Sequence, residues 1–197
     1  MIFEVTHPSD TMTHHPSTEL IAASAPAVAV RLRALADDDW PAVSRWLHAD
    51  PVRPVWGDAD DNLRLLRTAL APGQGRAVIE AAGRAVGLVL WQHPTRAELD
   101  QAGLFDLPTE AVDIDIMIGE PDAVGRGIGP RAITQVADQA LARPDVPFVM
   151  ACAGVGNRAS QSAFEKAGFR PDRTFDDAPF GPHVLLVRRR HHRQEPA

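Results

Sequence analysis

Cysteine is almost absent from this 197-residue chain, which has one, Cys152, and tyrosine is missing altogether. A single cysteine excludes an internal disulfide and a zinc site built from several cysteines, and this usage is typical of a reducing compartment. Long apolar runs are missing as well, because no stretch approaches the roughly 20 residues that a membrane-spanning helix needs. We therefore expect a cytoplasmic protein without a membrane partner.

The signals of export are missing too. Residues 1–25 mix Thr, Ser, Pro and His, without the charged start and continuous apolar segment of a secretory signal. We expect them to form a disordered leader. The one basic cluster, residues 188–193, lies at the C-terminus, and residues 191–197 are expected to form a flexible tail.

An excess of positive charge is also lacking, since the formal net charge is −6. Affinity for phosphate backbones depends on Lys and Arg, so this balance argues against a nucleic-acid partner and favours a cationic ligand. Histidines occur as adjacent pairs at 14–15 and 191–192. Neighbouring residues do not share one face of a helix or strand, so we expect no metal site.

The central part of the chain, residues 26–190, has the length of one domain with a buried core. Alternating apolar and basic residues predict a strand within 28–35, and three consecutive acids at 37–39 predict the start of a helix that runs to about residue 49. A second short helix is expected on three leucines at helical spacing: Leu63, Leu66 and Leu70.

From residue 76 the pattern changes to strands. Residues 77–92 hold two apolar runs joined around 82–84, which predicts an antiparallel hairpin. Residues 93–111 are polar and form either a functional loop or a partly helical segment. The segment 112–118 predicts a strand with Asp113 and Asp115 on one face and four aliphatic residues on the other.

The C-terminal part continues with a glycine-rich turn and then alternates between helix and strand. We expect a helix over 130–142, a strand over 148–153 and a helix over 157–168. A last hairpin is expected over 174–188, with its turn at 180–183.

The glycine-rich turn is the strongest functional signal, because it lies between a strand and a helix. Its backbone N–H groups and the helix N-terminus converge on one point, which suits a phosphate or pyrophosphate. A Rossmann fingerprint would come early in the chain, whereas four strands precede this turn, and a P-loop would need Gly-Lys-Ser/Thr. The turn reads Val124-Gly125-Arg126-Gly127-Ile128-Gly129, followed by Pro130.

The order of elements over residues 28–188 resembles the GNAT superfamily of acetyl-CoA-dependent N-acetyltransferases. The turn resembles that family's pyrophosphate loop, with Val124 where many members have Gln or Arg. Asn157 and the segment 162–169 resemble the Asn…(Y/F)EKxGF helix, whose Asn contacts pantetheine, and the strand 113–118 matches the bulged strand that bonds pantetheine. The resemblance implies an α/β fold with a mixed, mostly antiparallel sheet, a splayed parallel pair of strands and flanking helices.

The resemblance also implies acetyl-CoA as co-substrate and a homodimer as the assembly common in the family. The residues expected to bind the coenzyme are Met117, Ile118, Val124, Gly125, Arg126, Gly127, Ile128, Gly129, Pro130, Asn157, Phe164 and Lys166.

Within the superfamily, several short segments resemble the aminoglycoside 6'-N-acetyltransferases: 46–47, 55–57, 114–115, 119–121 and 181–182. In that branch the residue matching Asp115 faces the acceptor amine, which makes Asp115 the candidate base. Asp113, Trp56 and Trp91 are expected to line the acceptor pocket with it. Cys152 and Phe180 stand where resistance enzymes have acids.

A transferase of this kind lets a neutral amine attack the thioester, so the protein must supply a base and an oxyanion donor. A backbone N–H at Met117 or Ile118 is expected to polarise the carbonyl. Many relatives protonate the thiolate with a Tyr, and Phe164 occupies that position here. The thiolate then leaves unassisted or through water, or the protein binds acyl-CoA without turnover.

The resemblance leaves the acceptor open. An aminoglycoside, and hence antibiotic resistance, is one candidate, and the same fold supports acylation of a siderophore precursor or a protein N-terminus. The polar segment 93–111 is either a solvated face or a surface that attracts a polyamine, through its acids Glu98, Asp100, Asp106 and Glu110.

Overall fold

The computed structural model describes residues 28–50, 52–177 and 180–190. The expected leader, the expected tail and both histidine pairs lie outside these ranges. Within them, no helix has the length and apolar character to cross a membrane. The same ranges hold no group of three or more His, Cys, Asp or Glu side chains arranged to bind a metal ion.

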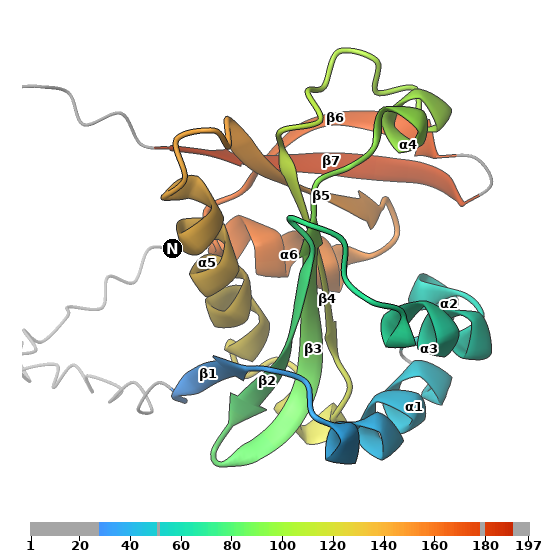
Figure 1. Cartoon of the computed structure of the whole chain (residues 1–197), viewed down its shortest axis with the longest axis vertical. Coiled ribbons are helices and arrows are strands. Elements are labelled where there is room, and N and C mark those ends of the chain that lie inside the picture. Colours follow the sequence, from blue (N-terminus) through green and yellow to red (C-terminus); the bar gives the residue numbers. More distant parts are fainter. Residues whose placement is uncertain (1–27, 51, 178–179, 191–197) are drawn as a thin grey trace, which may run out of the picture.

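Seven strands form one sheet in the order β1-β2-β3-β4-β5-β7-β6 (Figure 1). All neighbouring strands are antiparallel except β4 and β5, which are parallel and pair only at Val112↔Val149 and Asp113↔Met150. Beyond Asp113 the two strands diverge, so the mixed sheet with a splayed parallel pair is confirmed. The strands are β1 (Val30–Arg33), β2 (Gly75–Ala81), β3 (Arg84–Gln92), β4 (Val112–Ile118), β5 (Phe148–Gly154), β6 (Arg170–Asp177) and β7 (Gly181–Arg189).

The helices agree with the sequence in order and differ in extent. The helix expected from residue 130 begins two residues earlier, and α3 ends before Leu70. The segment 93–111 is partly helical, because Thr95 and Glu98 form a capping box that starts α4. The helices are α1 (Trp40–His48), α2 (Arg53–Trp56), α3 (Ala59–Arg67), α4 (Arg96–Gln101), α5 (Ile128–Leu141) and α6 (Arg158–Lys166), with short 3-10 turns η1 (Asp37–Asp39) and η2 (Pro121–Ala123).

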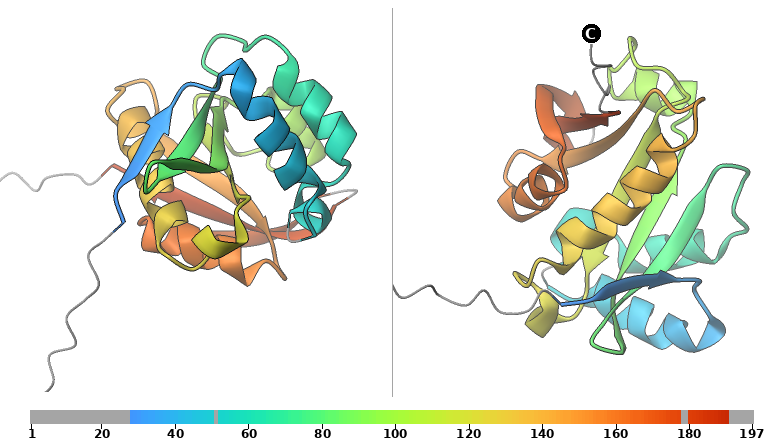
Figure 2. Two further views of the ribbon diagram at one scale, coloured as in Figure 1. Left: turned by 90° about the horizontal axis from the view of Figure 1, so that it is seen from below. Right: turned by 90° about the vertical axis from the view of Figure 1, so that its left-hand side faces the viewer.

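Helices cover both sides of the sheet, and the hydrophobic core is divided accordingly. Helices α5 and α6 lie on one side, and α1 to α3 lie on the other (Figures 1 and 2). One apolar cluster joins α5 and α6 to the sheet, and a second joins α1 and α3 to β2, β3 and β4. A third cluster packs the segment around α4 against β5 and β7. The two faces of β4 therefore have different surroundings.

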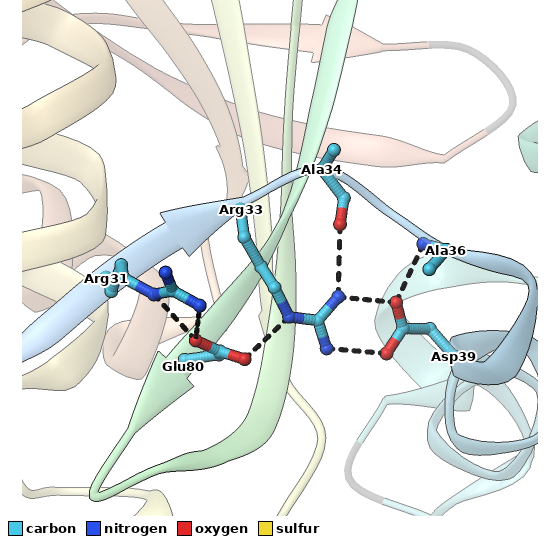
Figure 3. Close-up of polar contacts among 6 residues, drawn as sticks. All are labelled: Arg31, Arg33, Ala34, Ala36, Asp39 and Glu80. Atoms are coloured by element: carbon cyan, nitrogen blue, oxygen red, sulfur yellow. Dashed lines mark hydrogen bonds and ion pairs between the residues drawn. The ribbon is translucent and has the colours of Figure 1, made fainter.

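A cluster of charged residues fixes the start of α1 to the edge of the sheet (Figure 3). The Arg33 guanidinium donates to both carboxylate oxygens of Asp39, at 2.6 and 2.7 Å, and its Nε donates to Glu80 at 2.6 Å. Asp39 also accepts from the backbone N–H of Ala36 at 2.8 Å. Because Asp39 is 7% exposed, this two-bond pair ties β1, β2 and η1 together in a partly buried place.

The C-terminal hairpin corrects one expectation. Residues 180–183 were expected to form its turn, but β7 begins at Gly181, which pairs with Asp177 of β6. Residues 181–183 are thus strand, and the connection is residues 178–180, of which 178 and 179 lie outside the description. Strand β7 lies between β6 and β5, and His183 also pairs with Gly154. Pairing on both edges outweighs the local turn preference of Gly and Pro.

Candidate active site

The glycine-rich turn forms an anion site at the N-terminus of α5, a helix of 14 residues. Gly125 and Gly127 have φ angles of 76° and 72°, which glycine adopts readily. The space where their side chains would stand is open, and no side chain caps the helix. Over the described ranges, the N–H groups of residues 125–129 donate to no backbone carbonyl. These unpaired donors and the helix dipole fit the pyrophosphate of coenzyme A.

Side chains contribute little to this turn. Val124 and Arg126 are exposed, whereas the Ile128 side chain is buried in the core, so only its backbone faces the turn. Gly129 is buried and has no positive φ. A methyl group there would lie 3.9 Å from each of its neighbours, Ile116, Ile118 and Ala163. The fold therefore does not require glycine at 129.

Strand β4 presents a free backbone edge to the splayed region. The Gly119 N–H donates to the Val86 carbonyl at 2.9 Å. Since hydrogen-bonded residues alternate along an antiparallel ladder, Met117 also directs its N–H towards β3, and Ile118 directs its N–H away from β3. Strand β5 has diverged at this level. Of the two N–H groups expected to polarise the thioester, only that of Ile118 is free of the sheet.

The bulge implied by the family resemblance is displaced. Residues 113–118 pair with β3 in continuous register. Directly after them, Gly119 and Glu120 both donate to the Val86 carbonyl, at 2.9 and 3.2 Å. Two residues therefore oppose one, as in a β-bulge, at the end of β4 rather than within it. The Met117 side chain is buried beside α1 and α3, away from the open edge.

A cavity of about 560 Å³ lies beside the glycine-rich turn. Its walls come from the start of β1, from α5 and from the end of α6. Three of the residues expected to bind the coenzyme line it: Gly127, Pro130 and Lys166. Arg131 lines it as well and donates to the Val28 carbonyl, which holds the edge strand against α5. The cavity therefore offers two cationic side chains next to the anion site.

Helix α6 places its two expected coenzyme residues differently. Asn157 caps the helix, since its Oδ1 accepts from the Ser160 N–H at 3.1 Å, and its side-chain NH₂ keeps two donors. Phe164 is 2% exposed and packs edge-to-face on Phe169 with ring centroids 5.1 Å apart. The assignment of Phe164 to the coenzyme site is corrected, because this ring belongs to the core.

Asp113 and Asp115 lie on the same face of β4, as expected, and the aliphatic residues of the strand face α5. Asp115 is exposed, and Asp113 is half-buried with its Oδ1 enclosed and without a hydrogen-bond partner. Neither forms an ion pair over residues 28–50, 52–177 and 180–190. Although the Asp115 residue as a whole is exposed, protein atoms surround its carboxyl, and this desolvation raises its pKa. Desolvation together with the Asp115 charge raises the pKa of Asp113 well above its usual range.

Cys152 of β5 shares this environment. Burial raises the pKa of its thiol far above the usual value, and the carboxylates of Asp113, Asp115 and Asp177 raise it further. The thiol is therefore neutral and is not a nucleophile. Asp177, at the end of β6, and Glu98 of α4 also raise the pKa of Asp113. Four acids thus contribute negative potential to one region, which suits a cationic amine.

His183 and Asp177 are two further candidate site residues that the sequence does not predict. The His183 Nδ1 lies 2.8 Å from the Gly181 carbonyl oxygen, which only accepts, so Nδ1 donates this bond. A side chain on Gly154 would lie 4.0 Å from the His183 Nε2, so the ring lies over the end of β5. The alternation of Gly181, His183 and Leu185 along a strand is the signal that could have found it.

The two tryptophans lie on opposite sides of the sheet. Trp56 packs with α1 to α3, on the side that also holds Met117. Trp91 pairs with Ile114 and contacts the α5 cluster, whereas the preceding residue, Leu90, pairs with Asp115. Side chains of adjacent residues point to opposite faces of a strand. The expectation that Trp91 lines a pocket with Asp115 is therefore wrong.

Two of the acids of the segment 93–111, Asp100 and Asp106, have ion-pair partners. Asp106 accepts two bonds from Arg173 of β6, at 2.8 and 2.9 Å, and Asp100 pairs with Arg96 at 2.8 Å. The Asp106 pair fastens the segment to the terminal hairpin, and the Asp100 pair lies within α4. Glu98 is the only acid of this segment that raises the pKa of Asp113. The segment as a whole therefore does not form an acidic surface that attracts a polyamine.

The fold and the site together define an enzyme class. They combine a candidate anion site for a pyrophosphate on one side of β4 with an open strand edge and with acids on the other face. A sequence model described as an acetyltransferase (GNAT) domain matches residues 36–177. The protein belongs to the GNAT family of acetyltransferases and is an acetyl-CoA-dependent N-acetyltransferase. A search of curated proteins found no match.

Solved structures share the fold at low sequence identity. An aminoglycoside acetyltransferase AAC(6')-Ib in complex with coenzyme A is 19% identical, with a TM-score of 0.70 over 82% of this chain and 95% of that one. The same enzyme with paromomycin and acetyl-CoA is 18% identical, with a TM-score of 0.71 over 86% and 99%. Spermidine N-acetyltransferase from Vibrio cholerae, with CoA and spermine, is 16% identical, with a TM-score of 0.61 over 81% and 95%.

Proposed function

We propose that this protein transfers the acetyl group of acetyl-CoA to a primary amine of a small cationic acceptor, and that Asp115 is the base. The observation that carries the proposal is the pair of carboxyls on β4, the accessible Asp115 and the partly enclosed Asp113. Both face away from the coenzyme turn and have no cationic partner over the described residues. An ammonium group is the ligand that compensates such charges.

The chain supplies each element of direct amine attack. The N–H groups of residues 125–129 hold the pyrophosphate, and the Asn157 NH₂ and the open edge of β4 hold the pantetheine arm. The Ile118 N–H is the oxyanion donor, because the sheet does not use it. Asp115 takes the ammonium proton, and its raised pKa makes it a stronger base than an ordinary aspartate. Acetyl-CoA supplies the thioester.

An aminoglycoside is the first acceptor to test, and a polyamine is the second. Structural neighbours with these ligands support the choice. Two acids of the aminoglycoside enzymes are replaced by Cys152 and Phe180, and the Phe180 ring is 74% exposed. Asp177 and Glu98 supply negative charge in the same region. We therefore expect an acceptor with fewer ammonium groups than an aminoglycoside, or one with an apolar part.

The direct test is release of coenzyme A thiol from acetyl-CoA with a panel of amines: an aminoglycoside, spermine, a monoamine, a hydroxamate precursor and an N-terminal peptide. The last two represent siderophore and protein acylation. Asp115→Asn should lower kcat/KM for the preferred amine by about 10² to 10⁴-fold, the usual contribution of a general base. Asp172→Asn, at an exposed position of β6, is the control. Full activity of Asp115→Asn would remove the base assignment.

A second candidate, a non-catalytic acyl-CoA-binding module, is favoured by one observation. The chain has no Tyr, and Phe164 is buried in the core. This candidate predicts saturable binding of acetyl-CoA and no thiol release with any amine of the panel. Thiol release above the rate of spontaneous hydrolysis, with any one amine, would exclude it.

A further inference from the structure

His183 of β7 has a ring nitrogen that the folded chain leaves free. Its Nδ1 donates to the Gly181 carbonyl at 2.8 Å, which leaves Nε2 on the opposite edge of the ring. Over residues 28–50, 52–177 and 180–190, Nε2 has no hydrogen-bond partner. In the neutral ring the bond to Gly181 keeps the proton on Nδ1, so Nε2 carries the lone pair. Such a nitrogen can accept a proton and return it.

The His183 ring extends over the end of β5 towards the gap between β5 and β4. His183 pairs with Gly154 of β5, and a side-chain carbon placed on Gly154 would lie 4.0 Å from Nε2. On the other side the ring has Phe175 of β6, with the ring centroids 6.0 Å apart. Because residue 154 is glycine, it places no side chain between Nε2 and the gap.

The register of the sheet puts His183 close to the level of the proposed oxyanion donor. Strands β4 and β5 run parallel and last pair at Asp113↔Met150. Gly154 lies four residues beyond that pair and Ile118 lies five residues beyond it, so their levels differ by about 3.3 Å along the strands. A thioester whose carbonyl accepts from the Ile118 N–H therefore lies in the gap beside Gly154, and the His183 ring stands over that place.

His183 and Asp115 project from the same face of the sheet. The residues next to them along the strands belong to the apolar cluster under α5 and α6, and side chains alternate between faces. Cys152 of β5 shares the face of His183, and the Asp115 charge raises the pKa of its thiol. An amine that gives its first proton to Asp115 thus approaches the thioester on the side where Nε2 stands.

The start of α6 is fastened to the same end of β5. The Gly154 carbonyl accepts from the Asn157 N–H at 2.8 Å and from the Gln161 side chain at 2.9 Å. The Val155 N–H donates to the Pro182 carbonyl at 3.0 Å. Asn157, which offers its side-chain NH₂ to the pantetheine arm, is held by these bonds. None of them uses the His183 side chain, so replacing the imidazole leaves the arm's binding group in place.

Other acidic groups are poorly suited to protonate a thiolate at this level. The chain has no tyrosine. Burial raises the pKa of the Cys152 thiol far above its usual value, which makes it a poor acid. Asp113 lies five residues from Ile118, about 17 Å along β4. Asp115 holds the proton that it has taken from the ammonium group. The departing sulfur therefore needs a proton from another source.

We propose that the His183 imidazole is a proton shuttle, which takes the second proton of the attacking amine and gives it to the departing coenzyme A thiolate. The inference rests on the proposed acetyl transfer. Asp115 first takes one proton from the ammonium group, and the neutral amine nitrogen then forms a bond to the acetyl carbon. Nε2 takes the proton that this nitrogen must still lose to become an amide, directly or through one water. The carbon–sulfur bond breaks with its electron pair moving to sulfur, and Nε2 returns the proton to sulfur. His183 is neutral before and after the reaction, and Asp115 releases its proton to water.

A single turnover measures the chemical step without product release. With enzyme in excess over acetyl-CoA and a saturating amine, the rate constant of thiol release should fall by about 10²-fold in His183→Ala and in His183→Gln. The Kd for acetyl-CoA should match that of the wild type in both variants. The control is His48→Ala on α1, because the His48 Nδ1 makes the same kind of bond, at 2.8 Å to the Ser44 carbonyl. Its rate constant should equal that of the wild type.

Two results would overturn the proposal. One is a loss of less than about tenfold in His183→Ala, well below the usual contribution of a proton-transfer group. The other is a loss of rate that is accompanied by an equal loss of acetyl-CoA affinity in both variants. That result would mean that His183 supports the coenzyme site and does not transfer a proton.

Chemical rescue separates proton transfer from support of the fold. Imidazole can enter the space that His183→Ala leaves, so it should raise the single-turnover rate of this variant with its concentration, after subtraction of the reaction without enzyme. It should not do so for His183→Gln, whose side chain fills that space. A rate of His183→Ala that does not respond to imidazole, while acetyl-CoA still binds, would contradict the shuttle.

The failure of this inference is distinguishable from the failure of the proposed function. If the wild type releases no thiol with any amine of the panel, the acetyl transfer fails, and the shuttle fails with it. If the wild type is active and His183→Ala is equally active, the acetyl transfer stands and the role of His183 fails.

Discussion

At the scale of single residues, the structure distinguishes glycines that the backbone requires from one that it does not. Gly125 and Gly127 have positive φ angles, whereas Gly129 has none and has room for a methyl group. Gly129→Ala should therefore shift the melting temperature by no more than a few degrees. The same change should weaken acetyl-CoA binding by tenfold or more, because the methyl group would enter the space between the anion site and β4.

Calorimetric titration and thermal unfolding of Gly129→Ala together provide the measurement. Unchanged affinity would show that the ligand does not approach the backbone at 129. A large loss of stability would show that the fold itself requires this glycine. Gly125→Ala should instead be destabilised even without ligand, because an alanine at its φ of 76° is strained.

The raised pKa of Asp113 also predicts that the stability of the protein depends on pH. Its pKa is raised in the folded protein, so the native state binds more protons than the unfolded state at any pH between about 3.9, the ordinary value, and the raised one. The free energy of unfolding therefore falls as the pH rises through that interval. Asp113→Asn removes this contribution, and its melting temperature should exceed that of the wild type at pH 7.

Melting curves of wild type and Asp113→Asn between pH 4 and pH 8 test this sign. The difference in melting temperature should be small at pH 4 and should grow towards pH 8. A difference that stays constant with pH, or that favours the wild type at pH 8, would mean that Asp113 is not destabilised by ionisation. Asp172→Asn should show no such trend.

At the scale of elements, the partly buried pair of Arg33 and Asp39 holds β1, β2 and the start of α1 together (Figure 3). Asp39→Ala removes both bonds to the guanidinium and the bond to the Ala36 N–H. We expect a loss of about 2 kcal/mol in the free energy of unfolding, as for hydrogen bonds to charged groups that leave a partner unsatisfied. Asp145→Ala breaks the exposed pair with Arg143 and should cost much less, because solvent screens an exposed ion pair.

Urea unfolding of both variants gives the comparison. The sign with pH is opposite to that of Asp113, because Arg33 lowers the pKa of Asp39. This contribution is present above the unfolded pKa and is lost as the pH falls through the folded one. Equal losses for Asp39→Ala and Asp145→Ala would contradict the structural role assigned to the cluster.

Elements with strong local signals were predicted from the sequence. The alternation in 112–118 gave β4 with its acids on one face, and Asn157 with Gly168 bounded α6. Elements that depend on pairing between strands were not predicted from the sequence. The segment 181–183 contains Gly and Pro, which favour a turn, yet it pairs with strands on both sides. Helix α2 is a single turn with a proline in its first turn and has no periodicity to detect.

At the scale of the whole molecule, β4 and β5 splay apart, and the proposed function places the coenzyme on one side of β4 and the acceptor on the other. The coenzyme side is predicted from the sequence, because the glycines and the Asn helix are contiguous motifs. The acceptor side is assembled from β4, α4, β6 and β7, which are far apart in the chain. Neither the positions of Asp177 and His183 nor the face of Trp91 follows from local spacing. Only the register of the sheet determines them.

The central claim is that the turn at residues 125–129 binds acetyl-CoA, and isothermal titration of the purified wild type with acetyl-CoA tests it most directly. The account predicts saturable binding of one molecule per chain, with a Kd below about 1 mM, the upper end of the usual range for enzyme substrates. Absence of binding heat at acetyl-CoA concentrations well above that value would contradict both the transferase and the acyl-CoA-binding interpretation.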